Sequence, residues 1–194
     1  LLDFQSGETL SEIKADVGYY ASFANASGDV LFAARRGRAE ANRLPGGESI
    51  WQEPETSRST SAPIVVDGKL IYSGSSGIRV REAETGKIIW QAGHGNNGYQ
   101  NAIPVVWDNL LIANGEHLRA LDMSTGKEVW RVLCAQDVER FKRSRRQTMA
   151  GSSSPVIAGD LAWFGHDDGS LRAVEKDGKV AWEYRVGVPI KTSP

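Results

Sequence analysis

The sequence predicts an all-β fold that is built from repeated units of four short strands. Glycine is abundant, with 21 glycines among 194 residues, and such a content indicates many tight turns. The chain also matches itself at an interval of about 40 residues, a period typical of architectures in which small β units stack side by side. Apolar residues make up 40% of the chain, enough for a globular core. These observations favour a β-rich fold with many turns.

The repeat is clearest where it ends in a tryptophan. Residues 120–130 read ALDMSTGKEVW, and residues 80–90 read VREAETGKIIW, at an offset of 40. Weaker copies end at Trp51 and Trp182, and each has a glycine four residues before the tryptophan. A further copy opens the chain, with Ser11 at the position of the tryptophan. The motif sets the boundaries of the units.

A second landmark, a proline after a small or apolar residue, recurs in phase with the tryptophans. It lies at Pro63, Pro104, Pro155 and Pro194, and the spacings of 41, 51 and 39 place one insertion in the second interval. Short apolar runs flank a turn in each unit, as in VVDGKLIY at residues 65–72. Further turns are expected at residues 36–37, 76–77, 114–115 and 168–169. Each unit therefore predicts four short strands joined by hairpins.

A four-stranded unit of this length cannot bury both faces alone, so neighbouring units must stack face to face, as the blades of a β-propeller do. An aromatic ring on the outermost strand buries about 150 to 250 Å² against the next blade, and glycine permits the positive φ of the hairpin before it. We assign this structural docking role to Trp51, Trp90, Trp130, Trp182, Gly86 and Gly126. We expect a β-propeller with about four full blades and partial blades at both ends.

The motif at residues 120–130, Ala-x-Asp-x-x-Thr-Gly-Lys-x-x-Trp, resembles the repeat of the quinoprotein-like, or PQQ-repeat, β-propeller family. The resemblance covers nearly the whole chain apart from residues 132–150, and it implies an extracytoplasmic location. That family includes dehydrogenases that bind pyrroloquinoline quinone (PQQ), outer-membrane assembly scaffolds, and propellers attached to phosphoesterases or kinases. The resemblance implies the fold and leaves the activity open.

The dehydrogenase branch of that family typically holds its quinone under two adjacent cysteines and uses calcium with a catalytic aspartate. This chain has one cysteine, Cys134, so it lacks the adjacent pair. We therefore expect no cofactor, with PQQ and calcium as the alternative. The sequence has no glycine-rich phosphate loop, nucleophile elbow or HExxH motif, so we identify no catalytic or metal-binding residue and favour a protein that is not an enzyme.

The charge balance argues against nucleic acid and membrane surfaces as partners. There are 23 Lys and Arg against 24 Asp and Glu, which gives a formal net charge of −1. No apolar run approaches the roughly 18 residues that span a bilayer. The expected partner is a protein or a small ligand at one face of the propeller.

A basic insertion between blades, at residues 132–150, is the first candidate binding site. It brings together five cationic residues, Arg140, Lys142, Arg143, Arg145 and Arg146. Insertions in repeat proteins often project from the binding face, so this segment predicts contact with an anionic group or an acidic partner. The alternative is a solvated loop, because one basic run on a near-neutral chain is weak evidence for nucleic-acid binding.

A polar loop at residues 94–101 is the second candidate. It offers hydrogen-bonding groups at His94, Asn96, Asn97, Tyr99 and Gln100. The loop leads into the innermost strand of a blade, near the expected mouth of the central channel, where such groups orient a sugar or a peptide. The alternative is a Gly/Asn connection between blades.

Two histidine segments are interpreted as structural. His166, Asp167 and Asp168 are ligand-type residues, but Asp168 falls at the hairpin position of the other units. His117 lies beside Glu116, with no third residue to complete a triad, and we expect it on the surface.

Together these patterns predict a non-catalytic β-propeller scaffold or binding module over residues 1–194, which presents a polar mouth and a basic insertion to a protein or a small ligand. The alternatives are the quinone-binding portion of a dehydrogenase and the accessory propeller domain of a phosphoesterase. We expect a fragment or partial ring. Two copies then complete one ring as a homodimer, or the strands at the two ends combine into one composite blade.

Overall fold

The computed structural model describes residues 3, 5–9, 23–35, 37–56, 61–74, 76–93, 102–134 and 153–194. These residues form sixteen strands in four antiparallel sheets, each with the strand order of the chain. The first sheet holds β1 (Phe23–Ser27), β2 (Val30–Arg35), β3 (Gly37–Arg43) and β4 (Ser49–Glu55), and the second holds β5 (Ile64–Val66), β6 (Lys69–Gly74), β7 (Gly77–Glu82) and β8 (Ile88–Ala92). The third holds β9 (Val105–Trp107), β10 (Leu110–Asn114), β11 (Leu118–Asp122) and β12 (Glu128–Val132), and the fourth holds β13 (Val156–Ala158), β14 (Leu161–Gly165), β15 (Ser170–Val174) and β16 (Val180–Arg185).

These four sheets are the full blades that the repeat predicts. The first hairpin of the second sheet shows why the turn residues matter: Val66 pairs with Lys69, so only Asp67 and Gly68 connect the strands. Both have positive φ, 48° and 70°, as a two-residue type I′ turn requires. The described residues contain no helix that is long and apolar enough to cross a membrane.

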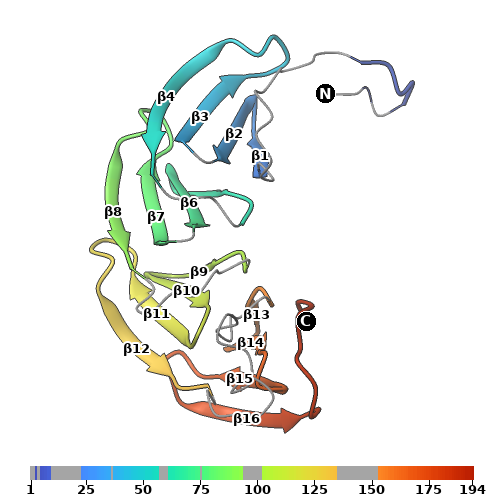
Figure 1. Ribbon diagram of the computed structural model, residues 1–194, viewed down its shortest axis with the longest axis vertical. Coiled ribbons are helices and arrows are strands. Elements are labelled where there is room, and N and C mark those ends of the chain that lie inside the picture. The colour runs from blue at the N-terminus through green and yellow to red at the C-terminus, as the bar shows by residue number, and fades with distance from the viewer. Residues whose placement is uncertain are drawn as a thin grey trace.

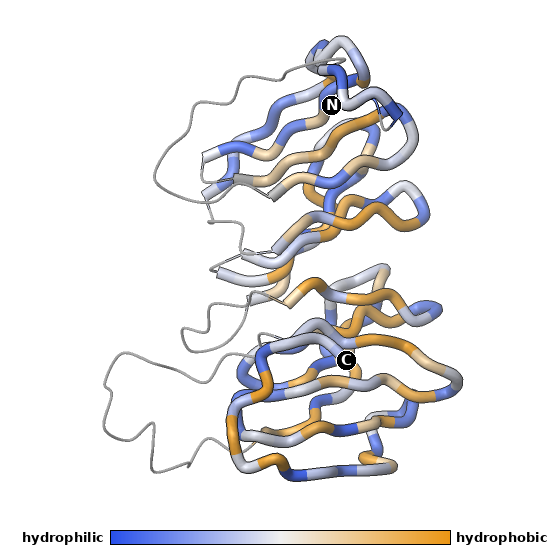
Figure 2. The backbone as a smooth tube through the Cα atoms, turned by 90° about the vertical axis from the view of Figure 1, so that its right-hand side faces the viewer, coloured by the Kyte–Doolittle hydropathy of each residue, from blue (hydrophilic) through white to orange (hydrophobic). Residues whose placement is uncertain are grey.

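The sheets stack along an arc, with β4, β8, β12 and β16 on its outer rim (Figure 1). Each apolar core lies between two neighbouring sheets rather than inside one. Ile112 and Leu118 of the third sheet, for example, pack with Phe164 and Val174 of the fourth. Equivalent clusters join the first sheet to the second and the second to the third. Figure 2 shows apolar stretches within the strands and polar residues at many of the turns.

Tryptophans of the outer strands contact the next sheet. The indole N–H of Trp51 donates to the carbonyl of Ala83 at 2.8 Å, and that of Trp90 donates to Met123 at 3.0 Å. Trp130 makes the same bond to Lys176 at 2.8 Å. Each ring lies against the turn between the third and fourth strands of the following sheet. The same contact therefore recurs at each interface between neighbouring sheets, which we call a seam.

Candidate functional site

One edge of the four sheets gathers the connections between them. In each sheet the turn between the second and third strands lies at the same end as the terminus of the fourth strand, because the third and fourth strands are antiparallel. Leu118 at the start of β11 pairs with Val132 at the end of β12, and Ile78 pairs with Ala92 in the same way. We call this end of the sheets the connection edge.

Both binding segments predicted from the sequence leave from the connection edge. The loop with His94, Asn96, Asn97, Tyr99 and Gln100 follows Gly93 directly and lies outside the described residues. The basic residues Arg140, Lys142, Arg143, Arg145 and Arg146 follow Cys134 and also lie outside them. Their roles therefore stay predictions, and the described site consists of the residues from which these segments start.

A pocket of about 250 Å³ lies at the connection edge of the second sheet. It is lined by Ser76, Arg79, Gln91, Ala92 and Gly93, so it borders the start of the predicted polar loop. Arg79 donates to the Ser76 hydroxyl at 3.1 Å, which holds the guanidinium against the pocket wall. The pocket thus combines a cation, an amide and a hydroxyl within one small concavity.

Three arginines recur at one position of the third strand and bridge neighbouring sheets. They are Arg79, Arg119 and Arg172, each one residue before the partner of an outer-strand tryptophan. Each reaches the end of the outer strand before it: Arg79 pairs with Glu55 at 2.8 Å, Arg119 donates to the carbonyl of Gly93 at 2.9 Å, and Arg172 lies 3.5 Å from the sulfur of Cys134. No motif singled out in the sequence includes this series. Its signal is an arginine that recurs in β7, β11 and β15, one residue before the position that pairs with the tryptophan.

Glu55 forms a buried charge cluster with Arg79 and Arg81. The Arg81 guanidinium lies 3.2 Å from the carboxylate and donates to the Tyr72 hydroxyl at 2.9 Å, while that hydroxyl donates to Glu55. Burial, followed by the contact with Glu55, raises the pKa of Tyr72 well above its usual range, so Tyr72 stays neutral and donates. Every group of the cluster is engaged with another, as a structural role requires.

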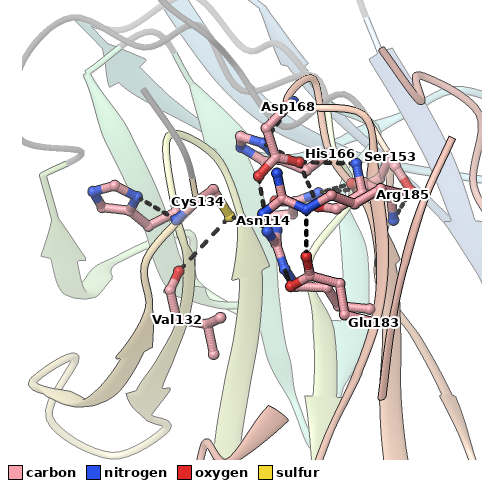
Figure 3. A network of polar contacts seen from close by, with 12 residues as sticks. Asn114, Val132, Cys134, Ser153, His166, Asp168, Glu183 and Arg185 are labelled. Atoms are coloured by element: carbon pink, nitrogen blue, oxygen red, sulfur yellow. Dashed lines mark hydrogen bonds and ion pairs between the residues drawn. The ribbon is translucent and has the colours of Figure 1, made fainter. Parts of the chain in front are cut away.

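A second polar cluster surrounds His166 in the turn between β14 and β15 (Figure 3). The backbone N–H of Asp168 donates to Nδ1 of His166 at 3.1 Å, and Nε2 lies 3.0 Å from the carbonyl oxygen of Gly115. Both ring nitrogens therefore lie within hydrogen-bond distance of a backbone group. The Asp168 carboxylate lies 3.5 Å from Nδ1.

Arg172 ties this cluster to the outer strand. Its Nη2 lies 2.9 Å from Asp168, and its Nε donates to Glu183 at 2.8 Å. Burial raises the pKa of Asp168, but contacts with His166, Ser170 and Arg172 outweigh it and hold that pKa well below its usual range. Burial lowers the pKa of His166, but Asp168 and Cys134 together outweigh it, so that pKa lies above its usual range.

Cys134, His166 and Asp168 bring three metal-ligand atoms within 4.8 Å of one another. Arg172 already supplies the positive charge at this point, with its guanidinium on both Asp168 and the sulfur of Cys134. A calcium ion bound there would have to displace that guanidinium and would meet a sulfur ligand in place of the oxygens that calcium prefers. These residues therefore do not fit a calcium–quinone pair.

His117 differs from its expected place on the surface. It is half-buried, and its Nδ1 accepts the backbone N–H of Cys134 at 3.2 Å. Burial is the largest effect on its pKa and lowers it. Sequence alone gives no sign of this contact, because residues 117 and 134 meet only through the pairing of β11 with β12.

Four-stranded antiparallel sheets, stacked face to face around an arc with interlocked seams, define this protein as a β-propeller. The chain belongs to the PQQ_2 family, described as "Outer membrane protein assembly factor BamB", whose model matches residues 35–193. No curated protein matches the chain.

Solved structures share the fold at low identity. The computationally designed protein Ika8 has a TM-score of 0.66 at 12% identity over 87% of this chain and 50% of its own. The quinohemoprotein alcohol dehydrogenase ADHIIG from Pseudomonas putida HK5 has a TM-score of 0.66 at 16% identity over 86% of this chain and 34% of its own. The quinohemoprotein alcohol dehydrogenase from Comamonas testosteroni has a TM-score of 0.66 at 17% identity over 93% of this chain and 40% of its own. The chain thus spans half or less of the length of these structures.

Proposed function

We propose that this chain is a non-catalytic propeller module that binds a protein or a small polar ligand at its connection edge. The observation that carries this proposal is the pocket lined by Ser76, Arg79, Gln91, Ala92 and Gly93. It lies at the edge from which both predicted binding segments depart. A concave site with a few polar groups is the usual form of a ligand site.

The chemistry of the pocket favours a ligand with both acceptors and donors. Arg79 shares the Glu55 carboxylate with Arg81, so its positive charge is only partly compensated and the pocket offers directed N–H groups. Arg119 holds the carbonyl of Gly93 nearby, and its Nη2 is buried without a hydrogen-bond partner in the part of the chain that is described. The polar groups that line the pocket, on Ser76, Arg79 and Gln91, suit the hydroxyls of a sugar or the backbone of a peptide.

The buried state of the other polar clusters supports binding over catalysis. His166 is fully buried, and both of its ring nitrogens are engaged by backbone groups. Cys134 is 4% exposed and lies against Arg172. A substrate cannot reach either group without opening the seam between the third and fourth sheets.

The family description supports a protein as the partner, because it names an assembly factor. The structural neighbours that are dehydrogenases share the fold alone, and the described residues near Asp168 do not fit calcium. A binding role is therefore the function that the geometry supports best.

Chemical-shift mapping tests the proposal with two defined probes. A ¹⁵N-labelled chain is titrated with maltotriose and with reduced, carboxymethylated α-lactalbumin as an unfolded polypeptide. We expect the amide signals of Ser76, Gln91 and Gly93 to shift with at least one probe. The variant Gln91→Glu should weaken the response several-fold, whereas Gln52→Glu, at the equivalent position of the first sheet, should not.

Two results would overturn the proposal. One is the absence of shifts at the pocket with both probes. The other is stoichiometric binding of PQQ in the presence of Ca²⁺ with reduction of an artificial electron acceptor by ethanol, which would favour the dehydrogenase.

A further inference from the structure

The charge cluster beside the pocket of the second sheet carries one more cation than anion. Arg79 and Arg81 share the single carboxylate of Glu55, at 2.8 and 3.2 Å. Within the described residues, neither arginine forms an ion pair with another acid. Tyr72 adds no negative charge, because its hydroxyl is neutral and donates to Glu55. All four side chains are buried, so water screens the excess positive charge poorly.

Of the two arginines, Arg79 is the one that can bind a further group. The three guanidinium nitrogens of Arg81 all donate to protein oxygens, namely the Tyr72 hydroxyl and the carbonyls of Gly86 and Pro54. Arg79 uses Nε on Glu55 and Nη2 on Ser76, and no residue in the described ranges accepts a hydrogen bond from its Nη1. Arg79 also lines the pocket, so a ligand there can reach the cation that the cluster leaves only partly compensated.

The side chain next to Arg79 offers further donors. Gln91 of β8 pairs directly with Arg79 of β7, so the two side chains lie on the same face of the sheet. Its amide adds N–H groups to those of the guanidinium, whose planar fork matches the two oxygens of a carboxylate. None of the described residues that line the pocket is acidic. The lining therefore favours an anion over a cation.

The size of the pocket limits the ligand to one small group. Its volume of about 250 Å³ is below the roughly 300 to 1,000 Å³ of pockets that hold drug-sized ligands. The space is open beside Gly93, because nothing lies within 4 Å of a Cβ added to that residue. A pocket of this size accommodates a single acidic side chain or a small organic acid.

We propose that the pocket binds one carboxylate group through Arg79 and Gln91. This inference rests on the proposed function and names the ligand chemistry of that same site. The bound carboxylate accepts charge-assisted hydrogen bonds from the guanidinium and brings the cluster to two anions for two cations. Such a carboxylate belongs either to an acidic side chain of a protein partner or to a free small acid, and the experiment separates these sources.

Two peptides that differ only in charge test the proposal. The ¹⁵N-labelled chain is titrated at constant ionic strength with Ac-Gly-Glu-Gly-NH₂ and with Ac-Gly-Gln-Gly-NH₂. We expect the amide signals of Ser76, Gln91 and Gly93 to shift, with a Kd for the Glu peptide at least about tenfold lower than for the Gln peptide. Sodium butyrate, which has the carbon chain of a glutamate side chain, identifies the source. Binding as tight as that of the Glu peptide assigns the carboxylate to a small acid, and weaker binding assigns it to a protein side chain.

Removal of the excess charge should remove the preference for the Glu peptide. Arg79→Gln leaves Glu55 paired with Arg81 alone, so the buried cluster becomes neutral and the fold should persist. We expect this variant to bind the two peptides with equal affinity. The matched control is Arg43→Gln, which removes an arginine whose side chain is 56% exposed and which should keep the preference.

A second variant blocks the pocket without touching the charges. Gly93 is not among the glycines with positive φ, so Gly93→Leu introduces a side chain into open space without backbone strain. We expect at least about tenfold weaker binding of the Glu peptide, at an unchanged midpoint of thermal unfolding. This variant keeps the test decisive if Arg79→Gln does not fold.

Equal affinity of the unchanged chain for the two peptides would overturn this inference and leave the proposed function standing. The absence of shifts at the pocket with both peptides and with butyrate would overturn it as well. The proposed function itself fails only if maltotriose and the unfolded polypeptide are also without effect at the pocket. The two proposals can therefore fail separately.

Discussion

Trp130 lies on Gly178, so that a Cβ added to that glycine would come within 2.8 Å of Cγ of the indole. The ring also donates its N–H to the carbonyl of Lys176 in the same turn, although the turn around Gly178 is one residue shorter than those around Gly86 and Gly126. The seam between the third and fourth sheets therefore has the same contact of a tryptophan ring with a glycine as the other seams, although its glycine turn is shorter. The sheets share this contact and not the length of the turn.

Removal of a seam tryptophan should destabilise the fold strongly. Trp90 is 8% exposed and donates to Met123, so Trp90→Ala removes both a large buried ring and a hydrogen bond. We expect a loss of about 3 to 5 kcal/mol in the free energy of unfolding, measured by urea denaturation. Trp107→Ala, a partly buried tryptophan of β9, serves as the comparison and should cost less. A loss below about 1 kcal/mol for Trp90→Ala would contradict the docking role.

The glycines beneath these rings should tolerate no side chain. Gly126 and Gly159 both have positive φ, 71° and 59°, but only the Cβ at Gly126 would meet an indole, at 2.6 Å. Gly159→Ala should cost about 1 kcal/mol from backbone strain alone. Gly126→Ala should cost at least about 2 kcal/mol more, because the ring of Trp90 must move. Equal losses in thermal or urea unfolding would show that the ring does not need the glycine.

The charge of Glu55 should be essential to the seam between the first two sheets. Its side chain is 1% exposed and pairs with Arg79 and Arg81, so Glu55→Gln leaves two buried guanidinium groups without their anion. We expect a loss of about 3 to 5 kcal/mol in stability. Glu84→Gln, at an exposed position, should change stability by less than about 0.5 kcal/mol. A similar small change for Glu55→Gln would mean that the two arginines find other partners.

Asp168 should make the fold sensitive to acid. Its pKa is lowered in the folded chain, so the unfolded chain, with an aspartate pKa of about 3.9, takes up the proton first as the pH falls. The stability that Asp168 contributes is therefore present above about pH 4 and lost below it. Urea denaturation at about pH 7 should give a free energy of unfolding for Asp168→Asn that is well below that of the unchanged chain. The difference between the two should be smaller at about pH 3. The exposed Asp160→Asn is the control, and a gap independent of pH would refute the charged role of Asp168.

The repeats in the sequence were sufficient to predict the blades. Periodic tryptophans, glycines and turn residues predicted four units of four strands, and the structure has four such sheets. The reason is local: strand alternation, two-residue turns such as Asp67-Gly68, and a fixed distance from glycine to tryptophan act within about 40 residues of sequence. The PQQ-repeat family followed from the same motif and is confirmed by the family match.

The polar clusters between the blades depended on contacts that the sequence does not display. Cys134 and Arg172 are 38 residues apart, and His166 meets the Gly115 carbonyl across 51 residues. Their approach follows from the stacking of the third sheet on the fourth, which brings the end of β12 against the turn after β14. The sequence by itself determined the strands, the turns and the family, because these depend on neighbours along the chain. Only the tertiary structure decided which charges are buried together, because that depends on what the neighbouring sheet places against them.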